Sequence, residues 1–583
     1  MRAFITLARY WRLLARYLRP HRFWMLALGS IVAATICVQI ATPLIAGRFI
    51  DRAVGGAPVR QLIYLTLLTT GLAIGAKVLT VAESYVAENI SWSATNALRL
   101  DLVGHLLRLD PTFHAAHTPG ELIERVDGDV DTLARFFSRS IVYLLGNSVL
   151  ILGVLALLIR IEWRIGLALS AFVLCALVIA LWIRARATTA WAAERQASAD
   201  FYGYLGENLA GLEDIRSSGA TPYVLHRTAT RMRTWLGVSI NAGMRGYAMV
   251  ASSTGLFGLG TAAVLAISVM RYRSGAISIG TVYLIYRFTD MLQQPTEQIR
   301  DEVQDLQQAD ASIGRIATLL GTQPELTDGA GAALPDGPLS VQFENVSFGY
   351  RTDTIVLHDL NVSIPPGHVL GVIGRTGSGK STLTRLLPRL YDPMRGVVRL
   401  GGVDLRTVSL AAIRSRVGLV SQDIHLFNAS LRDNLTIFDT TVPDCALEAA
   451  LQSVGLETWA SNLSHGLDTV LVSGAEGLSA GQAQLLACAR VFLTDPDVLI
   501  LDEPSSRLDP ATERLVHAAL EKLLVGRTGI IVAHRLSIIE LADDVLVLED
   551  GRIREYGPRI VLGADPESRY AELLTLSAAG VNM

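Results

Sequence analysis

The chain has 583 residues, of which 50% are hydrophobic and 18% are charged. Such a chain is too apolar to be wholly soluble or disordered, and too rich in charge to lie wholly in a membrane. The balance of 51 basic against 54 acidic residues leaves no overall positive field for nucleic acid. The four cysteines form no Cys-x-x-Cys pair, which argues against a disulfide framework or a zinc site.

The N-terminal segment, residues 1–22, is rich in arginine and contains no acidic residue. Leu7, Trp11 and Leu18 share one helical face, which predicts an amphipathic segment at the membrane surface. By the positive-inside rule this segment lies in the cytoplasm. A cleaved signal peptide is the alternative, but no A-x-A site follows and the next apolar run has full span length.

Six apolar runs reach the roughly 20 residues that cross a bilayer, and they predict an all-α transmembrane domain over residues 23–318. The connections after the second and fourth runs have roughly 55 to 60 residues, enough for helices that extend well beyond the bilayer. The other connections are short. We therefore expect the two long connections on the cytoplasmic side. The predicted spans are 23–46, 62–82, 137–159, 164–184, 246–270 and 279–299.

Some of these spans carry charged residues. Arg287 and Asp290 lie three residues apart near the middle of the sixth span. Charges at that depth are costly and face either a cavity or each other, so the pair lines a substrate pathway or forms a self-contained ion pair. Lys77, near the inner end of the second span, is interpreted as a structural residue that snorkels to the interface.

A phosphate-binding motif lies in the C-terminal part of the chain. A stretch rich in Gly, Pro, Ala and Asp predicts a linker over residues 319–339, and residues 340–583 read as an α/β domain. There, a strand ending at Ile373 precedes a G-x-x-x-x-G-K-S motif and a helix. The glycines let backbone amides surround phosphates, and the helix N-terminus adds its positive end. Lys380 would reach the β- and γ-phosphates and the Ser381 hydroxyl would bind Mg²⁺. The expected ATP-binding residues here are Gly374, Arg375, Thr376, Gly377, Ser378, Gly379, Lys380, Ser381 and Thr382.

A second buried strand, VLILDEP, ends in two carboxylates, Asp502 and Glu503. Asp502 stands where a strand tip can hold Mg²⁺, and Glu503 can polarise the water that attacks the γ-phosphate. Two ordinary acids after a strand are the alternative. The phosphate-binding motif upstream favours the catalytic interpretation.

The sequence LSAGQ precedes that strand and resembles the LSGGQ signature of ATP-binding cassette (ABC) proteins. With six spans, two long loops and one C-terminal cassette, nearly the whole chain resembles a half-transporter of the type IV exporter family. The resemblance implies ATP hydrolysis that drives export, with an ATP-gated membrane regulator or an exporter-fold importer as alternatives. Six spans argue against a soluble cassette ATPase. The signature residues, which would contact ATP held by a partner chain, are Leu478, Ser479, Ala480, Gly481 and Gln482.

The resemblance also assigns roles to single residues. Tyr350 corresponds to the aromatic residue that stacks on adenine, and Gln422 to the Q-loop glutamine that contacts Mg²⁺ and water. Asp509 resembles the D-loop aspartate, and His534 the switch histidine that contacts the γ-phosphate. The implied catalytic residues are Glu503, His534 and Gln422, and the implied Mg²⁺ ligands are Ser381, Gln422 and Asp502.

In this family two cassettes pair head to tail, because a single phosphate loop leaves the γ-phosphate exposed. The resemblance therefore implies a dimer in an inner or plasma membrane, with cytoplasmic cassettes and with the long loops transmitting cassette closure to the spans. Ala480 replaces the usual glycine and Arg507 replaces a usually small residue, which favours a non-identical partner chain over a homodimer. Drugs, lipids, peptides and siderophores are all left open as substrates.

Overall fold

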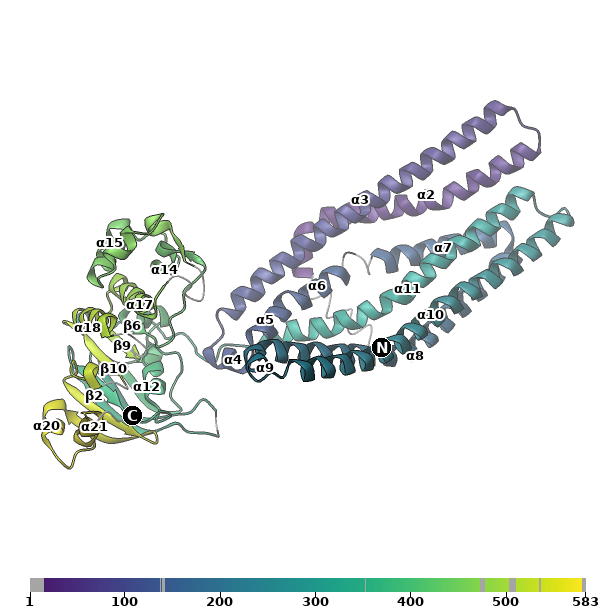
Figure 1. Ribbon diagram of the computed structural model, residues 1–583. Helices are drawn as coiled ribbons and strands as arrows, with labels where there is room; N and C mark the ends of the chain where they lie inside the picture. The colour runs from purple at the N-terminus through teal and green to yellow at the C-terminus, as the bar shows by residue number, and fades with distance from the viewer. Residues whose placement is uncertain are drawn as a thin grey trace. The chain divides into compact units, whose positions relative to one another are not determined.

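The computed structural model describes residues 15–136, 138, 142–351, 353–471, 478–502, 510–533 and 536–578. The chain divides into two compact units (Figure 1). The first holds the chain up to Leu107 and then Pro119–Thr322, and the second holds Arg108–Thr118 and the chain from Gln323 onward. A short piece of the first long connection therefore belongs with the C-terminal unit.

The first unit is a bundle of long helices, and every predicted span falls on one of them (Figure 1). Residues 137 and 139–141 of the third predicted span, and 1–14 of the predicted N-terminal segment, lie outside the described residues. Within the described part, five helices are long and apolar enough to cross a membrane. The last long helix is more polar because it carries Arg287, Asp290 and Glu297. The long helices are α2 (Arg22–Val54), α3 (Val59–Leu106), α7 (Val142–Ile161), α8 (Trp163–Ala210), α10 (Thr221–Arg273) and α11 (Ile279–Gly321).

The bundle is held together around α11, which packs against α2, α7 and α10. Phe288 on α11 is fully buried in an apolar cluster with Val154 and Leu169. At one end of the bundle, Asp51 of α2 accepts hydrogen bonds from Ser278 Oγ and Gly280 N, both at 2.7 Å. This carboxylate fixes the start of α11 against the end of α2.

The two long connections contain short helices at the segments where Pro and Gly interrupt the helical pattern. The first holds α4 (Pro111–Ala116), α5 (Pro119–Val126) and α6 (Gly128–Arg135), and the second holds α9 (Leu212–Ser217). The long helices α3 and α8 each have 48 residues, about 72 Å at 1.5 Å per residue, and so exceed the thickness of a bilayer.

The second unit is built on two β-sheets, which confirms the α/β class expected from the sequence. One sheet is antiparallel with the order β2-β1-β4-β5, and the other has the order β12-β11-β3-β10-β9-β6, parallel except for β12. A two-stranded sheet pairs β7 with β8. The strands are β1 (Val341–Phe348), β2 (Leu357–Ile364), β3 (Val369–Ile373), β4 (Arg395–Leu400), β5 (Val403–Asp404), β6 (Val417–Val420), β7 (Ala429–Ser430), β8 (Val470–Leu471), β9 (Val498–Asp502), β10 (Thr528–Val532), β11 (Asp544–Glu549) and β12 (Arg552–Pro558).

Helices cover the parallel sheet and create a core on each of its faces. Successive residues of β9 alternate between these cores: Leu499 and Leu501 belong to one and Val498 and Ile500 to the other. This two-sided burial explains why the strand reads as a continuous apolar run. The helices are α12 (Lys380–Leu386), α13 (Leu410–Arg416), α14 (Leu431–Thr436), α15 (Asp444–Ser453), α16 (Glu457–Ser461), α17 (Ala480–Thr494), α18 (Pro510–Leu524), α19 (Leu536–Ile539), α20 (Arg559–Ala564) and α21 (Arg569–Ala578).

The segment that connects α11 to β1 has no regular secondary structure. Helix α11 continues to Gly321, into the stretch that composition assigns to the linker, and β1 begins at Val341. Between these elements the chain forms neither helix nor strand.

Candidate nucleotide-binding site

The phosphate loop connects β3 to α12, as the motif predicts. Gly377 and Gly379 adopt φ angles of 85° and 101°, a region that side chains disfavour. A Cβ on Gly374 would lie 2.2 Å from the carbonyl oxygen of Leu548. These three positions therefore require glycine, and the backbone forms a turn with space for phosphate oxygens.

Lys380 lies at the centre of this turn and is 5% exposed. Its Nζ donates hydrogen bonds to the carbonyl oxygens of Gly374 at 2.7 Å and Arg375 at 3.1 Å. The Ser378 hydroxyl is buried and has no hydrogen-bond partner among the described residues. A buried hydroxyl in need of a partner, beside a fixed ammonium, fits the phosphate groups of ATP.

The predicted metal ligands come from two adjoining elements. Ser381 at the start of α12 donates its hydroxyl to Asp502 Oδ1 at the tip of β9, at 3.4 Å. Gln422 follows β6 by two residues, and β6 pairs with β9 in register Val420 to Leu501. Gln422 and Asp502 thus lie at or just beyond the carboxyl ends of neighbouring strands, and Ser381 at the start of α12 contacts Asp502. A hydroxyl, an amide and a carboxylate are oxygen ligands of the kind that Mg²⁺ prefers.

Tyr350 is positioned beside the helix that follows the phosphate loop. Its hydroxyl lies 3.1 Å from Thr382 Oγ1 and accepts a hydrogen bond from Arg385 at 3.3 Å. Its ring packs edge-on against Phe348 and Tyr391 and is 38% exposed. The sequence analysis did not identify Arg385 or Tyr391, although a basic and an aromatic residue shortly after a phosphate loop are a usable signal. Burial raises the pKa of Tyr391 above its ordinary value.

The signature segment begins α17 with a capping box. Ser479 Oγ accepts from Gln482 N at 3.1 Å, and Gln482 Oε1 accepts from Ser479 N at 2.9 Å. Ala480, which stands where the family signature has glycine, is exposed. Gly481 is buried, and a Cβ there would lie 1.8 Å from Thr512 Cγ2 on α18. The glycine thus permits two helices to pack closely, a reason that the sequence pattern did not reveal.

Three predicted residues, Glu503, Asp509 and His534, lie outside the described residues, as does Arg507. In the sequence, Glu503 directly follows β9 and His534 follows β10 by two residues. The strands β9 and β10 are neighbours in the sheet, in register from Val498 to Asp502. Their carboxyl ends therefore lie at the same edge of the sheet as the end of β3, which leads into the phosphate loop.

In the helical unit, Arg287 and Asp290 form an ion pair at 2.6 Å within one turn of α11. Their side chains are 40% and 48% exposed, so the pair is accessible as well as paired with itself. A role of these residues in a substrate pathway stays a prediction.

Two sequence families match the chain. Residues 25–296 match the ABC transporter transmembrane region, and residues 357–506 match the ABC transporter family. An ATP-dependent lipid A-core flippase of Chromohalobacter salexigens is 29% identical over 98% of both chains. A multidrug efflux ATP-binding/permease protein of Mycobacterium bovis is 32% identical over 93% of this chain and 46% of its own length.

The fold has a close match among solved structures. A bacterial Atm1-family ABC exporter with ATP bound superimposes with a TM-score of 0.80 over 96% of this chain and 98% of the exporter, at 24% identity. The whole chain therefore shares the fold of this solved structure, with the helical domain followed by the cassette. The chain belongs to the ABC transporters, as a half-transporter of the type IV exporter family in which ATP hydrolysis drives export.

Proposed function

We propose that two cassettes from two such chains close around ATP and that hydrolysis by Glu503, His534 and Gln422 reopens them, so that an amphipathic substrate is exported. The observation that carries this proposal is the phosphate loop, where the Lys380 ammonium is fixed by Gly374 and Arg375 and where Ser381 meets Asp502. The names of the relatives, a lipid A-core flippase and a multidrug efflux protein, support an amphipathic substrate.

The catalytic roles follow from position and chemistry. Glu503 directly follows the strand that carries Asp502, so its carboxylate is offered as the general base that takes a proton from the attacking water. Lys380 neutralises charge on the β- and γ-phosphates, and the Ser378 hydroxyl donates a hydrogen bond to a phosphate oxygen. His534 is offered as the γ-phosphate contact, and Gln422 as the residue that orients water.

Mg²⁺ is the cofactor that we propose for this site. Ser381, Asp502 and Gln422 would hold it, and the donor set fits because it contains only oxygen ligands. When bound, Mg²⁺ neutralises charge on the transferred phosphoryl group. The Ser381 hydroxyl and Asp502 Oδ1 lie 3.4 Å apart, so both oxygen atoms could serve as ligands of one cation.

The second chain completes the site. Each cassette offers the N-terminus of α17, with Ser479 and exposed Ala480, to the ATP held by its partner. A 15-residue helix presents a substantial positive end to a γ-phosphate. Ala480 and Arg507 favour a partner chain of different sequence. The arginine-rich start of the chain supports an inner-membrane orientation with the cassette in the cytoplasm.

The test is the substitution Glu503→Gln in the full-length chain reconstituted in lipid nanodiscs. Loss of a general base lowers turnover by a factor of about 10² to 10⁴. Binding of a fluorescent ATP analogue with Mg²⁺ should persist, because Lys380 and the phosphate loop are unchanged. Glu521→Gln, on the exposed face of α18, is the matched control. Steady hydrolysis by Glu503→Gln would refute the catalytic assignment.

The partner is tested by native mass spectrometry of the same nanodiscs after gentle purification from the native host. Two different chain masses would support the asymmetric pair, and one mass at twice the chain would establish a homodimer. A single chain that hydrolyses ATP at the full rate would contradict the shared site.

A further inference from the structure

Asp110 stands at the position directly before α4, in the piece of the first long connection that belongs to the cassette unit. An aspartate at this position usually accepts a hydrogen bond from an amide of its own helix. Here it makes no such bond. Instead its Oδ2 accepts from the backbone amides of Glu325 and Leu326 in the linker, the latter at 3.2 Å. Asp110 is 8% exposed, so this buried carboxylate is committed to the linker.

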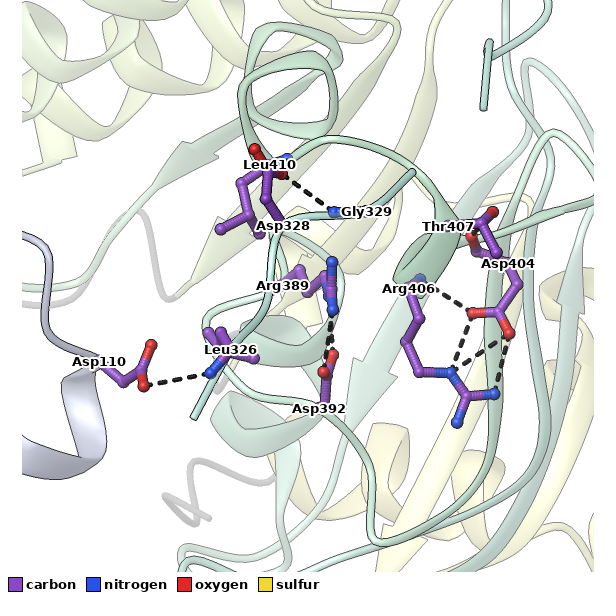
Figure 2. A network of polar contacts seen from close by, with 10 residues as sticks. All are labelled: Asp110, Leu326, Asp328, Gly329, Arg389, Asp392, Asp404, Arg406, Thr407 and Leu410. Atoms are coloured by element: carbon purple, nitrogen blue, oxygen red, sulfur yellow. Dashed lines mark hydrogen bonds and ion pairs between the residues drawn. The ribbon is translucent and has the colours of Figure 1, made fainter. Parts of the chain in front are cut away.

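The linker is fastened to the cassette a few residues further on (Figure 2). Asp328 Oδ1 accepts a hydrogen bond at 2.7 Å from Leu410 N, at the start of α13. The amides of Gly331 and Ala332 donate to the carbonyl oxygen of Thr407 at 3.1 and 3.0 Å. The linker is therefore bound on both sides: to the long connection through Asp110 and to the cassette through Asp328 and Thr407.

The turn to which the linker is hydrogen-bonded is itself stabilised by polar contacts. Asp404 precedes the short turn Leu405–Thr407 and accepts hydrogen bonds from the backbone and the guanidinium of Arg406 (Figure 2). Nearby, Arg389 is 2% exposed and makes two hydrogen bonds to Asp392, at 2.8 and 3.0 Å. The part of the cassette that contacts the linker is thus held in place by its own ion pairs and hydrogen bonds.

From this point two routes lead to the ATP site, one along the chain and one through the polar contacts of Arg416. Helix α13 runs directly into β6, which ends two residues before Gln422. Arg416, the last residue of α13, donates to the Pro335 carbonyl oxygen at 2.8 Å and pairs with Asp497. Asp497 directly precedes β9, which ends at Asp502. The linker is therefore bonded to the elements that carry both Gln422 and Asp502.

A matching arrangement occurs within the helical unit. His105, near the end of α3, lies 2.9 Å from the carbonyl oxygen of Leu319 near the end of α11. Asp129 of α6 is buried and accepts hydrogen bonds at 2.8 Å from Ser312 Oγ and Arg315 Nε, both on α11. In the helical unit, hydrogen bonds therefore join the first long connection to α11, the helix that leads into the linker. In the cassette unit, hydrogen bonds join the same connection to the linker itself.

We propose that Asp110 is a positioning residue that couples the helical domain to the ATP site through the linker, in addition to any contact made by a partner chain. If the first long connection moved without the linker, a buried carboxylate and two backbone amides would lose their partners together, which is costly. Connection and linker therefore move as one, and the movement reaches Gln422 and Asp502 through α13 and Arg416. This inference rests on the proposed function of the site.

The experiment is hydrogen exchange of the full-length chain in lipid nanodiscs, without nucleotide and with Mg–ATP plus vanadate. Three regions are followed: the phosphate loop at 374–381, the linker at 323–334, and the turn at 55–58 between α2 and α3. In Asp110→Ala we expect faster exchange of the linker amides, and a nucleotide response of the turn that is reduced roughly two- to thirtyfold, the range found for coupling mutations. Protection of the phosphate loop by nucleotide should be unchanged.

Three further variants separate coupling from folding. Asp110→Asn keeps an oxygen that accepts from both amides, so it should restore the response of the turn. Leu326→Pro removes one donor without changing the long connection, and should reproduce the loss. Glu325→Ala removes an exposed side chain but keeps its amide, and should behave as the unmodified chain.

The outcomes divide clearly. An undiminished response at 55–58 in both Asp110→Ala and Leu326→Pro would overturn the coupling role, while phosphate-loop protection in those variants would leave the proposed function standing. Linker amides that exchange equally fast in the unmodified chain and in Asp110→Ala would also overturn it. Failure of nucleotide to protect the phosphate loop of the unmodified chain would overturn the proposed function and the coupling role with it.

Discussion

The two units of this chain treat apolar residues in opposite ways. In the cassette, Leu499 and Val532 have no exposed surface, and the strands that carry them are covered on both faces. In the helical unit, Leu67 is 67% exposed and Leu259 is 73% exposed, although both lie within long apolar helices. The hydrophobic effect can therefore stabilise the cassette in water, whereas the surface of the bundle requires lipid.

Polar contacts are distributed accordingly. In the bundle they join helices that apolar packing alone would leave weakly specified, because lipid tails are as apolar as leucine. Asn147 donates to Gln298 at 2.8 Å between α7 and α11, and Asp51 fixes α2 to the start of α11. In the cassette, polar contacts instead hold the phosphate loop in shape through Lys380 and attach the linker through Asp328.

The largest effect is expected on ATP turnover, which depends on the cassette and not on the folding of the helical unit. Lys380→Ala removes the ammonium at the centre of the phosphate loop and should lower ATP turnover by a factor of about 10² to 10³. The helical unit should stay folded, because the two carbonyl oxygens that accept hydrogen bonds from Lys380 belong to the cassette's own phosphate loop. A phosphate-release assay in nanodiscs measures the turnover. Lys522→Ala on α18 is the control, and turnover within twofold of normal in Lys380→Ala would contradict the assignment.

Apolar truncation should distinguish the two kinds of burial. Leu499→Ala leaves a cavity in the centre of the cassette and should lower its free energy of unfolding by about 2 to 5 kcal/mol. Leu67→Ala should change stability by less than about 0.5 kcal/mol, because this side chain leaves no protein cavity. Thermal unfolding of both variants in nanodiscs provides the comparison. Equal losses in the two would show that the bundle buries Leu67 against protein, contrary to its 67% exposure.

Removing one buried carboxylate from the bundle should lower its free energy of unfolding measurably, although few atoms are lost. Asp129→Ala leaves Ser312, which is 2% exposed, without its hydrogen-bond acceptor, and should cost about 1 to 3 kcal/mol. Asp129→Asn keeps an acceptor and should recover part of that loss. Unfolding temperatures of the two variants measure the difference. Identical temperatures for Asp129→Ala and the unmodified chain would mean that α6 and α11 are held by other contacts.

A thiol in the cassette core should report burial through its reactivity. Full burial raises the pKa of Cys488 to about 12, so the folded cassette holds this side chain as the neutral thiol. Maleimide at neutral pH should modify it only after unfolding, whereas Cys445 is exposed and should react in the folded chain. Because the folded pKa is raised, the stability that the neutral thiol contributes is complete below the ordinary thiol pKa. It is lost as the pH rises toward 12. Mass spectrometry of labelled peptides measures the reaction, and rapid labelling of Cys488 in folded protein would exclude its burial.

A small stability effect should come from the ion pair on α11. Arg287→Ala or Asp290→Ala should change the free energy of unfolding by at most about 1 kcal/mol, because both side chains are accessible. We expect a clearly larger effect on accumulation of a fluorescent amphipathic dye in inverted membrane vesicles. If transport and unfolding were both unchanged, the pair would have no part in a substrate pathway.

Local motifs explain how much of this protein was predictable. The phosphate loop was found because its glycines, Lys380 and Ser381 are contiguous, and the predicted spans were found because a bilayer sets the length of an apolar run. The structure adds that Gly481 is required by Thr512 and that Arg385 and Tyr391 surround Tyr350. These contacts depend on how elements pack, so the spacing of residues within one motif does not reveal them.

The sequence by itself determined the two kinds of domain, their order and the nucleotide that the cassette binds. These follow from hydrophobic periodicity and from a phosphate-binding turn that only a few residue types can form. The tertiary structure alone decided where Asp110 and Asp129 direct their carboxylates. Their partners lie between 183 and 216 residues further along the chain. They are backbone amides, a hydroxyl and a guanidinium, and no local motif signals these pairings.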